Sequence, residues 1–150
     1  MYNTALRIVN QTADAEDVLQ EAFTDAFIQI KSFERKSTFG AWLKKIVIYK
    51  SVNFLKRKHT SFVDIENIKE PEEELKETDE EMMQMAVSAI KRKIRALPDG
   101  YRTVLSLYLL EGYDHEEIAQ ILGITHTTVR TQYSRAKQRL LTALKEDKDE

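Results

Sequence analysis

The 150-residue sequence predicts an all-α protein with two small helical domains joined by an acidic linker. Apolar residues recur at helical spacing over residues 5–59 and again over residues 82–145. Four Gly and two Pro are too few for a sandwich or barrel with many turns. Residues 60–81 are dense in acids and poor in apolar side chains, which is typical of an extended linker. The predicted domains are therefore residues 1–59 and 82–145, followed by a charged tail over residues 146–150.

Charge is segregated along the chain, although the formal net charge is only −2. Residues 31–60 carry nine bases and one acid, residues 64–81 ten acids and two bases, and residues 123–145 five bases and no acid. Such blocks indicate surfaces with different partners. The lack of Cys excludes disulfides and thiolate sites. Because no membrane span or signal peptide is visible, the sequence predicts a cytoplasmic location without membrane insertion.

In the first domain, helices are predicted with breaks near residues 10–13 and 33–38. On a helical wheel, residues 14–30 have an apolar half and a polar half. The apolar half contains Val18, Leu19, Ala22, Phe23, Ala26, Phe27 and Ile30. The polar half contains Asp14, Asp17, Gln20, Glu21, Thr24 and Asp25, with Ile28 in its midst. An acidic face with a solvated aliphatic favours a basic protein partner over DNA, and a plain surface helix is the alternative.

The segment 37–59 predicts a well-buried helix that carries a mixed stripe. Its aliphatics lie on two sides: Leu43, Val47, Ile48, Val52 and Leu55. Between them, at spacings of three or four, recur Trp42, Lys45, Tyr49, Asn53 and Lys56. Aromatics interleaved with bases can stack unpaired nucleotides and hold phosphates. The preceding loop, with Lys36, Ser37, Thr38 and Phe39, is well placed to hold an everted base. Alternatively, Trp42 and Tyr49 belong to the core and the lysines extend past them.

The second domain predicts a helix-turn-helix. Asp114 and Glu117 have the spacing of a capping box, so a helix should begin at about His115. Gly123 can turn the chain, and Thr125 can cap the next helix. The predicted inner sides are Ile118, Ala119 and Leu122 on the first helix and Val129, Tyr133, Ala136 and Leu140 on the second. A plain helical hairpin is the alternative.

The outer side of the second helix is free of acids and suits a major groove. It contains Thr127, Arg130, Thr131, Ser134, Arg135 and Gln138. Arg can bond bidentately to guanine, and hydroxyl and amide groups add groove and phosphate contacts. His115 and His126 each lack a second ligand at helical spacing, so no metal is expected. No cofactor is expected either.

Taken together, the two halves resemble the bacterial extracytoplasmic-function (ECF) sigma factors, a class of RNA polymerase specificity subunit. The stretches AEDVLQEAF, F-x-x-WL, LP-x-x-Y-R and V-R-x-x-x-x-R-A-K follow one another in the family's order. The resemblance covers about 120 residues, as region 2 and region 4 of the family. Since Met1 falls inside the family's first conserved segment, the first helix is expected to be incomplete. The chain departs from common family residues at Tyr49, at Asn53 and at the THTT start of the last helix. The promoter preference of other family members is therefore not assigned to this chain.

The resemblance implies a task for each surface. The acidic helix, with Asp14, Asp17, Gln20 and Glu21 and by extension Asp25 and Ile28, would dock on the β′ clamp coiled coil of core polymerase. The loop and the stripe would melt and read the minus-ten element. The last helix, chiefly Arg130, Thr131, Arg135 and Lys137, would read the minus-thirty-five element. The resemblance also implies contact with the β flap and a possible anti-sigma factor.

Two other functions remain open from the residues alone. A free-standing helix-turn-helix regulator would bind duplex DNA as a dimer, but it leaves the acidic face and the stripe without a task. An enzyme of DNA strand exchange would need a nucleophile beside a base or a cluster of carboxylates, and the sequence offers neither arrangement. The sequence therefore predicts a promoter-binding protein that is not an enzyme.

Overall fold

The computed structural model describes residues 1–58, 62 and 87–148, and every element in this part of the chain is a helix. The chain divides into two compact units, residues 1–61 and residues 62–150. The all-α, two-domain prediction is therefore confirmed. The predicted linker, residues 60–81, lies outside the described residues except for residue 62.

The first unit contains α1 (Tyr2–Val9), α2 (Thr12–Gln29), the short 3₁₀ turn η1 (Ile30–Ser32) and α3 (Phe39–Arg57). α1 ends at Asn10, which has φ 62° and donates its N–H to the Leu6 carbonyl at 2.7 Å. Asn is one of the few residues that adopt this left-handed conformation readily. α3 begins after Thr38, whose Oγ1 accepts the Ala41 N–H at 3.2 Å. Both breaks fall where the sequence predicts them.

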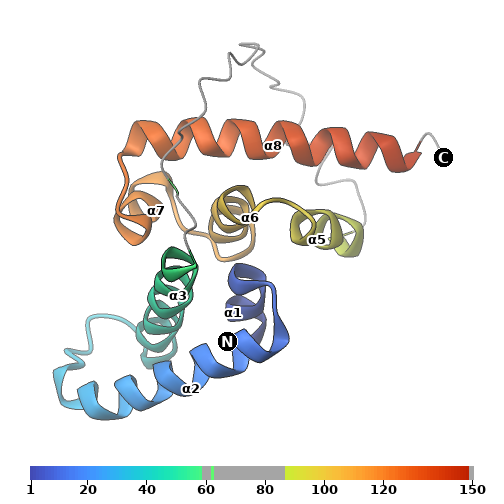
Figure 1. Ribbon diagram of the computed structural model, residues 1–150. Coiled ribbons are helices and arrows are strands. Elements are labelled where there is room, and N and C mark those ends of the chain that lie inside the picture. Colours follow the sequence, from blue (N-terminus) through green and yellow to red (C-terminus); the bar gives the residue numbers. More distant parts are fainter. Residues whose placement is uncertain (59–61, 63–86, 149–150) are drawn as a thin grey trace. The chain divides into compact units, whose positions relative to one another are not determined.

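The core of the first unit lies among its three α-helices, which pack on one another (Figure 1). All five predicted aliphatics of α3 are buried, which confirms the inner sides of this helix. α2 contributes mainly small residues, namely Ala15, Val18, Ala22 and Ala26. Small residues let helix axes approach closely, so α2 can lie against its neighbours with little side-chain volume between them.

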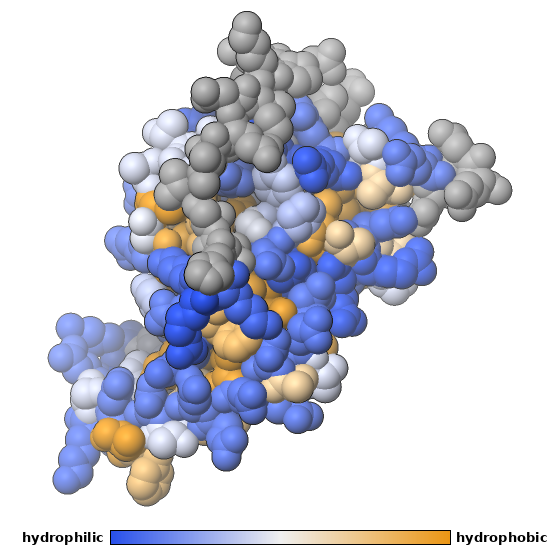
Figure 2. Space-filling model, viewed as in Figure 1, coloured by the Kyte–Doolittle hydropathy of each residue, from blue (hydrophilic) through white to orange (hydrophobic). Residues whose placement is uncertain are grey.

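The prediction for the apolar half of α2 is wrong in its outer part. Phe23 is 48% exposed, Phe27 80% and Ile30 49%. Figure 2 shows apolar surface at the C-terminal end of α2. The eight residues of α1 span about 12 Å whereas the 18 residues of α2 span about 27 Å, so α1 lies along only part of α2.

The second unit contains α5 (Val87–Arg95), α6 (Asp99–Leu105), the π-helical turn η2 (Ser106–Leu110), α7 (His115–Leu122) and α8 (His126–Lys148). In Figure 1, α8 runs past α7, α6 and α5 and contacts each of them. α8 does not stop at residue 145 but continues to Lys148, so residues 146–148 of the predicted tail are helical. The sequence also gave no sign of the π-helical turn.

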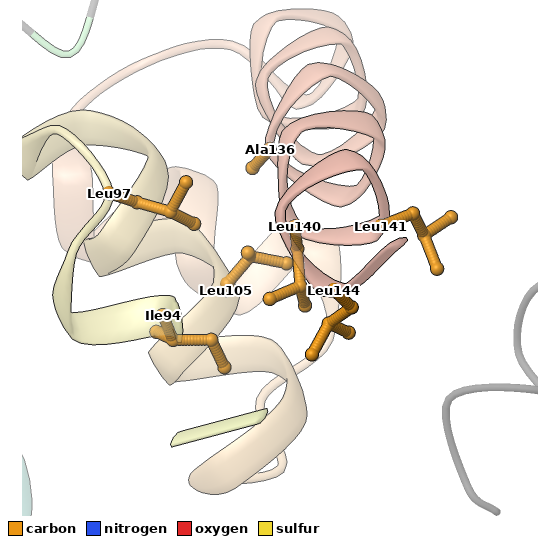
Figure 3. Close-up of a cluster of buried hydrophobic side chains, with 7 residues drawn as sticks. All are labelled: Ile94, Leu97, Leu105, Ala136, Leu140, Leu141 and Leu144. Atoms are coloured by element: carbon orange, nitrogen blue, oxygen red, sulfur yellow. The ribbon is translucent and has the colours of Figure 1, made fainter. Parts of the chain in front are cut away.

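Seven side chains from α8, α5, α6 and the α5–α6 turn form a buried cluster (Figure 3). These are Ile94, Leu97, Leu105, Ala136, Leu140, Leu141 and Leu144. Beside them Arg102, only 2% exposed, donates to the Leu97 carbonyl at 3.2 Å and pairs with the Asp99 carboxylate. The buried guanidinium thereby ties the α5–α6 turn to the first residue of α6, and its charge is compensated as burial requires.

Replacing Leu140 by Ala should destabilise the second unit. Leu140 is fully buried, so removing three carbons leaves a cavity and should cost about 2–5 kcal/mol of unfolding free energy. Thermal unfolding followed by far-UV circular dichroism should show the loss, whereas Lys145→Ala, an exposed change on the same helix, should not. Trp42, the sole Trp, reports on the first unit alone, and its fluorescence transition should stay in place. An equal shift of both transitions would contradict independent units.

Candidate protein and nucleic-acid interfaces

The polar face of α2 is only partly free for a partner. Asp17, Gln20 and Glu21 are exposed and, with Thr24, Asp25 and Lys50, line a shallow cavity of about 470 Å³. Ile28, 73% exposed, stands apart from this cavity on the same helix. The first and last acids of this face form ion pairs within the unit. Asp14 pairs with Lys58 at 2.9 Å, and Asp25 pairs with Lys50 at 2.5 Å. Among the acids of this polar face, Asp17 and Glu21 are therefore the ones open to a partner.

Three aromatic rings lie together where the loop meets α3. The ring centroid of Trp42 is 5.3 Å from that of Phe33 and 5.7 Å from that of Phe39, and the two Phe rings are 5.9 Å apart. Trp42 is half-buried by this packing, and Phe39 is 47% exposed. The loop is thus anchored on Trp42, while Phe39 presents an open ring. Phe33 belongs to this cluster but was missed as a site residue, because its place near a predicted break gave no helical phase.

The loop itself is exposed from Glu34 to Thr38. Lys36 pairs with Glu34 at 2.8 Å, a contact that is well solvated and contributes little to stability. Ser37 Oγ donates to the Thr38 carbonyl at 3.4 Å. Arg35 adopts φ 58°, the left-handed conformation, at the middle of the loop. Backbone and side chains therefore shape a short turn beside the aromatic cluster.

The predicted stripe along α3 lies at the surface. Lys45, Tyr49, Asn53 and Lys56 are exposed, with Tyr49 at 40%. Asn53 and Lys56 also line a second cavity, of about 450 Å³, together with Glu21, Lys50 and Arg57. The alternative that Tyr49 belongs to the core is therefore wrong, and for Trp42 it holds only in part. Aromatic, amide and ammonium groups follow one another on this face, as a single strand of nucleic acid would require.

The helix-turn-helix forms as its local signals predict. Asp114 accepts the Glu117 N–H at 2.8 Å, and the Glu117 carboxylate accepts the Asp114 N–H at 3.2 Å. Gly123 has φ 70°, and Thr125 Oγ1 accepts the Thr128 N–H at 3.1 Å. The predicted inner residues of both helices are buried, except that Tyr133 is half-buried.

The outer face of α8 is narrower than the sequence predicts. Thr127, Arg130 and Ser134 are exposed, whereas Thr131, Arg135, Lys137 and Gln138 are half-buried. The Thr131 hydroxyl donates to the Thr127 carbonyl at 3.1 Å, and the Lys137 ammonium lies 5.8 Å from the Tyr133 ring centroid. Arg135 and Gln138 line a cavity of about 440 Å³ with Tyr101 and the α5–α6 turn. Neighbouring helices therefore occupy one flank of the predicted groove-binding face.

A ring cluster at the start of the helix-turn-helix was missed by sequence reasoning. The His115 ring centroid lies 4.8 Å from Tyr108, 5.1 Å from Tyr133 and 6.0 Å from His126. The pKa of His115 is lowered, chiefly by burial. The neighbouring His126 and Arg130 also lower it, and the Asp114 carboxylate opposes them. Both histidines occupy the first position of their helices, which was visible in the sequence. Their proximity was not, because it depends on how η2, α7 and α8 pack.

Within the described residues, no group of three or more His, Cys, Asp or Glu is placed to hold a metal ion. A membrane-crossing helix is likewise absent from this part of the chain.

Comparisons with known proteins agree with this division into two units. The model of Sigma-70 region 2 matches residues 1–60, and that of Sigma-70 region 4 matches residues 81–140. The chain is 32% identical to the RNA polymerase sigma-H factor of Pseudomonas aeruginosa, covering 93% of this chain and 77% of the relative. It is also 32% identical to the ECF RNA polymerase sigma-E factor of Escherichia coli K12, with coverages of 85% and 72%.

Two further matches extend the comparison. The ECF sigma factor SigW of Bacillus subtilis is 27% identical, over 97% of this chain and 83% of the relative. Among solved structures, the sigma factor RpoE in complex with the anti-sigma factor NepR from Bartonella quintana has a TM-score of 0.62 at 23% identity. That match covers 96% of this chain and 89% of the other, and supports the fold. With both family regions matched in order, the chain belongs to the ECF sigma factors, which are transcription initiation factors of bacterial RNA polymerase.

Proposed function

We propose that the three exposed surfaces divide the work of a sigma factor among them. Asp17, Gln20 and Glu21 on α2, flanked by Asp14, Asp25 and Ile28, bind the β′ clamp coiled coil of core polymerase. The observation that supports this assignment is the exposure of Asp17 and Glu21, while the outer acids are paired within the unit. Exposed carboxylates can steer the encounter with a basic partner and fix its register.

The loop and the stripe of α3 take the minus-ten element. Phe39 offers an exposed ring next to the loop, supported from behind by Trp42 and Phe33. Along α3, Lys45 and Lys56 can hold phosphates, while Tyr49 and Asn53 can stack on or hydrogen-bond a base. Each captured base is worth roughly 1–3 kcal/mol of stacking, so a few bases offset the opening of several pairs. Lys36, Ser37 and Thr38 form the wall of this base-binding loop.

The recognition helix α8 reads the minus-thirty-five element as duplex. Arg130 supplies the base contact, Thr127 and Ser134 bind beside it, and Thr131, Arg135 and Lys137 contact the flanks and phosphates. The second unit also contacts the β flap. An anti-sigma factor that covers both units is a further proposed partner, supported by the RpoE–NepR complex among the structural matches.

A charge reversal tests the polymerase surface. The double change Asp17→Lys and Glu21→Lys should weaken binding to core polymerase roughly 30-fold or more, since breaking a charge contact in an interface costs about 2 kcal/mol or more. The measurement is a competition titration of core polymerase with the full chain. Glu16→Lys is the matched control, because Glu16 is an exposed acid of the same helix outside the cavity lined by Asp17 and Glu21. Equal losses in the control and the double variant would refute this surface.

Transcription from a promoter of the chain's own operon, reconstituted with core polymerase, tests the whole proposal. Specific initiation is the expected result. A chain that binds duplex DNA but never core polymerase would act as a free-standing regulator instead.

A further inference from the structure

One ammonium group lies between the proposed polymerase surface and the proposed nucleic-acid surface. Lys50 of α3 forms an ion pair with the Asp25 carboxylate of α2 at 2.5 Å, and about a third of each side chain is exposed. Lys50 also lines both of the cavities described above for the first unit. The other residues of the 470 Å³ cavity belong to α2, whereas Asn53, Lys56 and Arg57 of the 450 Å³ cavity belong to α3. Lys50 therefore connects the two surfaces.

The two cavities have opposite balances of charge. On the α2 side, three acids face the Lys50 ammonium. On the α3 side, the bases Lys50, Lys56 and Arg57 share the cavity with one acid, Glu21. The ion pair with Asp25 reduces the positive charge that Lys50 offers to the α3 side. A phosphate that binds at the α3 stripe therefore has to compete with Asp25 for this ammonium.

The Lys50 side chain can exchange one partner for the other. A Lys carries its charge on a flexible four-carbon stem, so the ammonium can move while the backbone of α3 stays in place. Lys50 and Asn53 are three residues apart on α3, which makes their side chains neighbours, and Asn53 belongs to the stripe. An ion pair that is partly exposed to water contributes little, so a competing charge can open it.

We infer that Asp25 holds Lys50 back from single-stranded DNA, and that a basic partner bound to α2 releases Lys50 as a further phosphate contact. The inference rests on the proposed roles of the α2 acids and of the α3 stripe. A base of the partner takes the Asp25 carboxylate, and the freed ammonium turns to a phosphate of the strand on α3. Binding at each surface then favours binding at the other, because coupling between two sites is reciprocal.

The test is the binding of the full chain to a fluorescent single-stranded oligonucleotide of mixed sequence, measured over a range of salt concentrations. Asp25→Asn removes the carboxylate charge and keeps the shape of the side chain, so it should free Lys50 without any partner. This variant should bind roughly twofold to fivefold more tightly than the wild type, the range expected for a partly exposed ion pair. One more phosphate contact should also steepen the slope of log K against log salt by about 0.7.

Two further variants separate the release of Lys50 from a general loss of negative charge. Glu16→Gln removes an exposed acid of the same helix that lines neither cavity, and it should keep the wild-type affinity and slope. Lys50→Met has a side chain of similar length without the charge. Adding Asp25→Asn to Lys50→Met should then change neither affinity nor slope, because no ammonium is left to free. Far-UV circular dichroism checks that each variant folds.

The outcomes separate this inference from the function on which it rests. An equal gain in Asp25→Asn and Glu16→Gln overturns the inference alone, as does a gain from Asp25→Asn that persists in the Lys50→Met background. An Asp25→Asn variant that binds like the wild type also overturns it alone. If neither the wild type nor Asp25→Asn binds the oligonucleotide at low salt, the inference falls together with the proposed role of the α3 stripe. The titration of core polymerase then shows independently whether the α2 surface binds its partner.

Discussion

Replacing Arg130 by Ala is expected to weaken binding to the minus-thirty-five duplex by about 1–3 kcal/mol, or roughly fivefold to 150-fold, and to leave core binding unchanged. Arg130 is exposed on the first turns of α8. Thr131 and Arg135, which the sequence also predicts to contact DNA, are half-buried. The Thr131 hydroxyl donates its hydrogen bond to the Thr127 carbonyl, and Arg135 lines the cavity beside Tyr101. We therefore expect Arg130 to reach a base edge with both of its terminal nitrogens.

A matched control separates base reading from loss of charge. Arg139→Ala removes the same charge from the same helix, but the Arg139 Cζ lies 5.0 Å from the Tyr101 ring centroid, about two and a half turns farther along α8. Fluorescence anisotropy with specific and scrambled duplexes should show reduced discrimination for Arg130→Ala only. If both variants lose affinity equally for both duplexes, Arg130 acts as a phosphate contact and not as a reader.

Replacing Trp42 by Ala is expected to reduce open-complex formation strongly while sparing recruitment to the promoter. Trp42 packs against both Phe33 and Phe39, so its removal leaves the base-binding loop and the exposed Phe39 ring without support. The loss of stacking at one base corresponds to about 1–3 kcal/mol, again roughly fivefold to 150-fold. Permanganate footprinting of the minus-ten region measures melting, and gel-shift of the closed complex measures recruitment.

Two variants serve as controls for Trp42→Ala. Trp42→Phe keeps a ring between the two Phe side chains and should retain most of the melting activity. Phe23→Ala removes an exposed ring of α2 that is not part of the Phe33–Phe39–Trp42 cluster, and this variant should melt DNA normally. Circular dichroism checks that each variant folds. Recruitment and melting that fall by the same factor in Trp42→Ala would contradict the proposed role of the cluster.

The helix-turn-helix was predictable from the sequence because its signals are local. The capping box of Asp114 and Glu117, the positive φ of Gly123 and the Thr125 cap each involve residues within one turn of one another. The inner aliphatics of α3 and α8 were equally readable, since a side chain's angle on a helix follows from its position alone. The same rule placed Lys45, Tyr49, Asn53 and Lys56 on one face, which is exposed.

Coverage by neighbours is what a helical wheel omits. Phe23 and Phe27 have the angle of a core face, yet they are exposed. Arg135 has the angle of a groove face, yet the α5–α6 turn flanks it. The pairing of Asp14 with Lys58 and of Asp25 with Lys50 joins residues distant in the chain.

The sequence by itself thus determined the two helical domains, the caps of the helix-turn-helix and the order of the two family regions, since each depends on residues close together or on composition. Only the tertiary structure decided which acids of α2 remain open, which ring of the Phe33–Phe39–Trp42 cluster is exposed, and that His115 meets His126. These properties arise where separate helices pack, and packing distances between helices are not encoded in the period of any one of them.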